Sequence, residues 1–141
     1  QGVSSAASDV YKRQVHIAAR TSGAETPADR LRAEISAELD FFSSRRIEFR
    51  AMAEVMANHR DASFVRALND VSTAETEALA DLLVQGQKLG QFRAFDVNEV
   101  AHLICAVKNG ALDRWSADET LDLASASATI LDFVESAVSA R

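Results

Sequence analysis

Apolar residues along the chain recur at spacings of three and four, the period of an α-helix, in several successive segments. The expected helices cover residues 26–43, 46–58, 61–89, 97–115 and 123–140. Alternating runs typical of strands do not occur, alanine is frequent, and proline occurs only once. The pattern therefore predicts an all-α fold, a helical bundle of about five helices.

Residues at the expected helix ends carry signals of their own. Thr26 can cap the first expected helix, and Pro27 follows at the first helical position, where its missing N–H costs nothing. Gly90 can adopt the left-handed conformation that ends a helix. Asp96 can cap the next helix while Glu99 reaches back to the N–H of Asp96, in a capping box. Residues 90–96 are therefore predicted to form a sharp corner between two helices.

The helices expected at 97–115 and 123–140 carry more apolar surface than one core needs. On a helical wheel the apolar side of 97–115 spans roughly 220°, against the 100° or so of a surface helix. We therefore expect a second buried surface, between two copies of the chain. The alternative is that a further part of the protein covers this surface. The candidate contact residues, each of which could instead belong to the intrachain core, are Ile104, Val107, Ala111, Trp115, Ile130, Val134 and Ala137.

The helices expected at 46–58 and 61–89 share an inner side rich in phenylalanine and methionine. Such side chains adapt to varied hydrophobic ligands, although the plainer interpretation is that they are core. The candidate residues of a ligand pocket are Phe49, Met52, Met56, Phe64, Leu68, Val71 and Glu75. Glu75 is the one carboxylate on the inner side of its helix. If buried, it needs a partner such as a cationic ligand, whereas at the edge of the helix it would lie in water.

The 141 residues carry a formal net charge of −6 and suffice for one domain with a real core. Residues 4–14 resemble the translation of a transposase adapter used to prepare sequencing libraries, so we expect 1–14 to be a non-native tail. Residues 15–25 would then be the remnant of a connecting helix and loop, followed by the folded domain at 26–141. An acidic domain is a poor match for a phosphate backbone, so we do not expect this piece to bind DNA by itself.

Several functional classes are disfavoured by the sequence. It contains no apolar run long enough for a membrane span and no signal-peptide pattern, so we expect a cytoplasmic protein without a membrane partner. Cys105 is the single cysteine, which excludes an intrachain disulfide. Glu99 and His102 have the Glu-x-x-His spacing of di-iron bundles, but the required second copy is missing. We therefore expect no enzymatic activity, no catalytic residue, no metal and no cofactor.

The stretch from Leu82 to Asp96, with its Gly-x-Phe-Arg-x-Phe-Asp corner, resembles the C-terminal half of TetR-family transcriptional regulators. The similarity continues through Asn109-Gly110-Ala111-Leu112 and Trp115, and the helix lengths from residue 26 onward suit the family's ligand-binding and dimerisation domain. The resemblance implies a homodimer in which the last two long helices of each subunit form a four-helix bundle. It also implies an unidentified small-molecule effector, which the pocket candidates suggest is hydrophobic.

The resemblance further implies an N-terminal helix-turn-helix that reads an operator. No stretch before residue 26 is long enough for that unit, so we expect DNA binding only through a domain that is missing from this fragment. The expected function is the effector-sensing domain of a TetR-like regulator, a repressor that releases its operator when ligand binds. The alternative is a non-catalytic helical interaction or adaptor domain. A cavity among Phe49, Met52 and Phe64 would favour the sensor, and a fully packed core would favour the adaptor.

Overall fold

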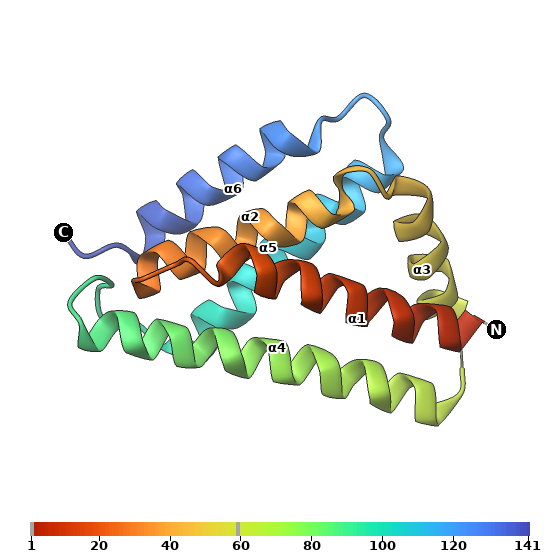
Figure 1. The fold of residues 1–141 in the computed structure, drawn as a ribbon, viewed down its shortest axis with the longest axis horizontal. Helices are drawn as coiled ribbons and strands as arrows, with labels where there is room; N and C mark the ends of the chain where they lie inside the picture. Colours follow the sequence, from red (N-terminus) through yellow and green to blue (C-terminus); the bar gives the residue numbers. More distant parts are fainter. Residues whose placement is uncertain (1, 59) are drawn as a thin grey trace.

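In the computed structural model, the described residues form six α-helices joined by short connections (Figure 1). The structure describes the backbone of residues 2–58 and 60–141, and the side chains of these ranges from residue 7 onward. The helices are α1 (Gly2–Thr21), α2 (Pro27–Ser43), α3 (Arg46–Asn58), α4 (Ala62–Lys88), α5 (Val97–Ala117) and α6 (Leu123–Val138). The all-α prediction is confirmed, and the bounds of the five expected helices differ from the observed ones by at most a few residues.

Helix α1, which comes in addition to the five expected helices, is longer than the sequence predicted. The sequence predicts only the remnant of a connecting helix within residues 15–25. The observed helix runs continuously from Gly2 and packs along α2. The rings of His16 and Phe41 lie 5.6 Å apart at this contact. Neither glycine nor proline occurs between residues 3 and 21, so nothing in the local sequence stops the helix before Thr21.

Four helices begin at a residue whose side chain accepts hydrogen bonds from the first turn. These N-caps are Thr26, Asp61, Asp96 and Asp122. The carboxylate of Asp96 accepts from the backbone N–H groups of Asn98 and Glu99, at 3.0 and 3.1 Å. Among the described residues Glu99 makes no bond back to Asp96, so only the forward half of the predicted capping box forms.

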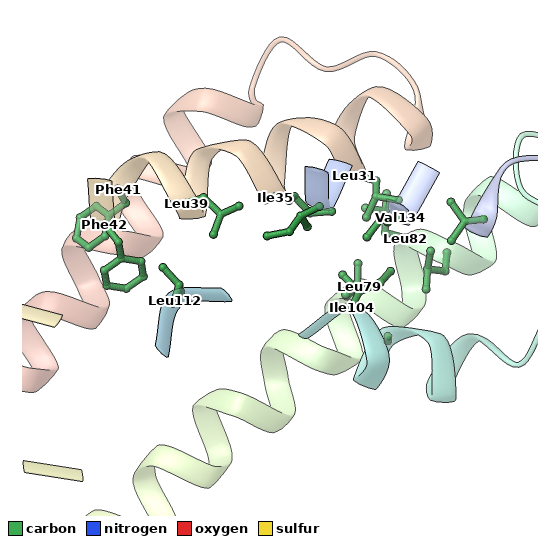
Figure 2. Packing of buried hydrophobic residues seen from close by; sticks show 14 of the residues in the cluster. Leu31, Ile35, Leu39, Phe41, Phe42, Leu79, Leu82, Ile104, Leu112 and Val134 are labelled. Carbon is green, nitrogen blue, oxygen red and sulfur yellow. The ribbon is translucent and has the colours of Figure 1, made fainter. Parts of the chain in front are cut away.

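The core is built around α2, whose inner side carries Leu31, Ile35 and Leu39, each at most 2% exposed. Figure 2 shows this row of side chains facing Leu79 of α4 and Ile104 of α5. Burying a side chain of this size contributes about 1.5–3 kcal/mol. In Figure 1, α6 lies along one side of α2, whereas α1 and α4 lie along the other. The central helix therefore holds the others in place.

A chain of aromatic rings fixes the short helix α3. Phe42 at the end of α2 lies 5.1 Å from Phe49 of α3, and Phe49 lies 6.3 Å from Trp115 of α5, both edge to face. Phe49 is the one fully buried residue of α3 within the described part of the chain. Edge-to-face pairs contribute about 0.5–1.5 kcal/mol beyond burial, so this contact determines where α3 lies.

The corner after α4 also holds the end of α6. Gly90 has a φ of 71°, which confirms the predicted left-handed conformation. The backbone N–H of Arg93 donates to the carbonyl of Val138 at 2.9 Å, and that of Ala140 donates to the carbonyl of Gln91 at 3.0 Å. The corner therefore pairs with the C-terminal residues, which lie far away in the sequence.

Leu89, the last residue of the helix expected at 61–89, is 67% exposed. It follows the last helical residue of α4, where the chain turns away from the core. Within the described ranges, none of the helices has both the length and the apolar character needed to cross a lipid bilayer.

Candidate ligand-binding site

A cavity of about 390 Å³ lies between α3, α4 and α5, with residues of α1 at its edge. Its volume falls within the range of roughly 300–1,000 Å³ that is common for small-molecule sites. Apolar side chains make up most of its wall, and the polar groups gather on α1, α4 and α5. This arrangement, an apolar wall with a few polar groups, is typical of a small-molecule site.

Most residues proposed for the pocket line this cavity. Its wall includes Phe49, Met52, Met56, Leu68, Val71 and Glu75. Phe64, the remaining candidate, is 6% exposed and does not line the cavity. It belongs to the first turn of α4, one turn before the part of the helix that forms the wall at Leu68.

The pocket candidates included no residue of α5, although this helix contributes to the wall. Leu112, Asn109 and Asp113 line the cavity, the last two from the polar side of the helix. A polar side is normally assumed to face solvent, and Asn109 and Asp113 are indeed exposed, but they also line the cavity. Their spacing of four residues, which places both on one side of a helix, was the only available signal.

Four charged side chains form a cluster at the polar end of the cavity. Arg13 of α1 donates to the Glu75 carboxylate on α4, and its other terminal nitrogen lies 3.6 Å from Glu38 Oε1 on α2. Lys108 of α5 donates to the second carboxylate oxygen of Glu38. The cluster thus holds two carboxylates and two cations, drawn from four helices.

This charge cluster separates the first cavity from a second one. The second cavity has a volume of about 530 Å³ and lies among α1, α2, α4 and α5. Glu38 and Lys108 line the second cavity, Arg13 lines the first, and Glu75 lines both. A charge at Glu75 therefore faces both spaces.

Burial and neighbouring charges shift two groups in the cluster. Burial raises the pKa of the Glu75 carboxyl above its ordinary value, and the Arg13 guanidinium opposes this shift without cancelling it. The side chain of Glu75 is nevertheless 41% exposed, partly because it faces two open cavities. Burial alone would lower the pKa of Lys108, but the charge and hydrogen bond of the adjacent Glu38 carboxylate, with smaller contributions from Cys105 and Glu75, together raise that pKa.

The residues proposed for a contact between copies divide into two groups. Four of them are at most 6% exposed and belong to the core of the chain itself: Ile104, Trp115, Ile130 and Val134. The other three are partly buried against that core: Val107, Ala111 and Ala137. The four side chains are buried because α2, α4 and α6 cover that side of α5, and because α2 and α5 cover that side of α6.

The same two helices leave other large apolar side chains in solvent. Leu103 on α5 is 61% exposed and Phe133 on α6 is 60% exposed. The wide apolar sectors of the sequence are thus divided between the core and an outer surface. Sequence periodicity could not decide which residues take which place.

No protein-family model matches the sequence, and no curated protein is similar enough to match it. Solved structures do match. A regulatory protein of the tetR family from Rhodococcus RHA1 has a TM-score of 0.81 at 16% identity, over 99% of this chain and 73% of that one. A TetR transcriptional regulator from Chloroflexus aurantiacus has a TM-score of 0.71 at 21% identity, over 99% of this chain and 71% of that one. The chain therefore has the fold of TetR-family regulators.

Proposed function

We propose that this chain is the effector-sensing and homodimerisation domain of a TetR-like transcriptional regulator. A small, largely hydrophobic molecule binds in the cavity between α3, α4 and α5. Binding is coupled to the release of operator DNA by a DNA-reading unit outside residues 1–141, so that the regulator is a repressor. The likeness to structures of TetR-family regulators supports the regulatory part of this proposal.

The cavity is the observation that carries the sensing part. Phe49 and Met52 both line a space of about 390 Å³, and the Phe49 ring also packs against Phe42 and Trp115. A domain that served only as a rigid adaptor would have no use for an apolar-walled space of this size, which is typical of small-molecule sites. The cavity therefore favours a sensor over an adaptor.

Contacts between α3 and the end of α5 support coupling between the cavity and the rest of the domain. Arg50 of α3 donates to the backbone carbonyl of Ser116. Arg46 donates to the carbonyl of Leu121 at 3.1 Å, and its guanidinium lies over the Trp115 ring at 4.7 Å. A ligand that displaces α3 would therefore also pull on the connection between α5 and α6.

Exposed apolar side chains on α5 and α6 support pairing with a second copy. Leu103 and Phe133 each present most of their surface to solvent. Covering them in a two-fold interface would remove this area from water in both subunits at once. In a dimer formed through α5 and α6, the segment between these two helices, which Arg46 contacts, would lie beside the interface.

A neutral apolar dye tests the sensing part. Nile red should become fluorescent on binding to the chain with a stoichiometry of one. Leu68→Trp, which fills the cavity from α4, should abolish this signal while the protein still melts cooperatively. Ile47→Trp is the matched control, because Ile47 is 79% exposed on α3 and does not line the cavity. Equal dye binding by both variants would show that the cavity is not the binding site.

A further inference from the structure

The charge cluster at the polar end of the cavity determines which ligand charge the cavity can accept. Glu38 is 7% exposed and is neutralised by the Lys108 ammonium, which contacts it directly. Glu75 is the second carboxylate, and it is partly buried between the two cavities. A positive charge beside Glu75 therefore stabilises its ionised form.

In this chain, Arg13 supplies that charge from α1, which also contributes to the cavity wall. Its guanidinium contacts Glu75 and reaches towards Glu38, at 3.6 Å from Oε1. Nε of Arg13 is buried and has no hydrogen-bond partner among the described residues. The ion pair between Arg13 and Glu75 therefore leaves one nitrogen of the guanidinium unbonded within the described part of the chain. It also depends on a side chain of α1 within residues 4–14.

The remaining charges on the first cavity's wall also favour a cation. Apart from Arg13, its ionisable wall residues are Glu75 and Asp113, both acidic. An anionic ligand would meet two carboxylates there, whereas a cation would be attracted to both. The opposite side, formed by Phe49, Met52 and Leu68, can hold an apolar body.

We propose that the cavity takes an amphiphilic monocation, whose ammonium or guanidinium group binds Glu75 at the place that the Arg13 guanidinium holds in this chain. Its apolar part lies between the phenylalanine and methionine side chains of α3 and the leucine side chain of α4. The inference rests on the proposed sensing function and names the chemical class of the effector. Arg13 competes with the effector for one carboxylate.

Three probes with one apolar body and different charges test this inference. Phenylbutylamine is cationic near neutral pH, phenylbutanol is neutral and phenylbutyrate is anionic. Calorimetric titration of the full chain carrying Arg13→Ala should show that the amine binds on the order of tenfold more tightly than the alcohol, as expected for one charge-assisted contact. The acid should bind more weakly than the alcohol. The chain with Arg13 in place should prefer the amine less.

Variants of α4 assign the preference to one carboxylate. Adding Glu75→Gln to the Arg13→Ala chain should remove the preference for the amine over the alcohol. Adding Glu77→Gln instead is the matched control, because Glu77 is exposed on the same helix and does not line either cavity. If Arg13→Ala fails to melt cooperatively, Arg13→Gln keeps hydrogen-bonding capacity without the charge and replaces it in every titration.

The outcomes separate this inference from the proposed function. If the Arg13→Ala chain binds the alcohol as tightly as the amine, or more tightly, the proposal of a monocationic effector is overturned. The chain would then remain a sensor of neutral molecules. A preference for the amine that survives Glu75→Gln would overturn the role of Glu75. No binding by any of the three probes, together with no dye binding, would overturn both the inference and the sensing function.

Discussion

Phe92 lies directly against Gly86, so closely that a Cβ atom on Gly86 would stand 2.0 Å from Cδ2 of the ring. The carbonyl of Gly86 also accepts hydrogen bonds from the N–H groups of Gln91 and Phe92, at 2.9 and 3.1 Å. The chain after α4 thus folds back onto the last turns of the helix. Gly86 interrupts the apolar side of α4 because the ring of Phe92, which is 5% exposed, takes the place of its side chain.

We predict that Gly86→Ala destabilises the domain by about 1–3 kcal/mol, because the new methyl group overlaps the ring and overpacking costs that much. Urea unfolding measures the loss. Gly23→Ala is the control, since a Cβ at Gly23 meets no atom within 4 Å and its φ is not left-handed. Equal stability of the two variants would contradict the close contact.

The proposed dimer predicts a change in mass when the exposed apolar side chains become charged. Light scattering at micromolar concentration should give a dimer for the unmodified chain and a monomer for Leu103→Glu/Phe133→Glu, because the charges would be buried unpaired. Ile47→Glu should remain dimeric, since Ile47 is exposed on α3. A monomeric unmodified chain would rule out pairing through these residues.

Arg46 should matter for stability although it lies on a short helix. Arg46→Gln removes a cation–π contact to Trp115 and a hydrogen bond to the Leu121 carbonyl, so we expect a loss of about 1–2 kcal/mol. Arg46→Lys should recover part of this loss by keeping the charge over the ring. Arg66→Gln on the exposed side of α4 should stay within about 0.5 kcal/mol of the unmodified protein. A smaller loss for Arg46→Gln than for Arg66→Gln would contradict the assigned role.

The raised pKa of Glu75 predicts a pH-dependent stability. The group faces Arg13 on α1, Glu38 on α2 and Lys108 on α5, and burial favours its protonated form in the folded state. Its contribution to stability is therefore present below the ordinary value of 4.5 and is lost as pH rises through the folded-state pKa.

Glu75→Gln cannot titrate, so its stability relative to the unmodified protein should increase as pH rises from about 4.5 towards neutral. Unfolding by urea at a series of pH values measures this difference. Glu77→Gln is the matched control, because Glu77 is exposed on the same helix and lines neither cavity. A difference that shrinks with rising pH for Glu75→Gln would mean that the folded protein favours the ionised carboxylate.

Local signals in the sequence predicted most of the helices and much of the cavity wall. The caps at Thr26 and Asp96 and the left-handed Gly90 depend on neighbouring residues only, so they could be inferred without a tertiary structure. Phe49 and Met52 were recognised because flexible and aromatic side chains on the inner side of a helix suit a pocket. The length of α1 was underestimated because residues 4–14 were set aside as a non-native tail.

The sequence by itself determined the helical class, the principal helix ends and the corner at residues 90–96, because these depend on backbone preferences and on contacts within one or two turns. Only the tertiary structure decided that Ile104 and Trp115 belong to the core whereas Leu103 faces solvent, and that Arg13 meets Glu75. Periodicity gives the angle of a side chain around its own helix, but not what lies opposite. That depends on how α2 brings together helices distant in sequence.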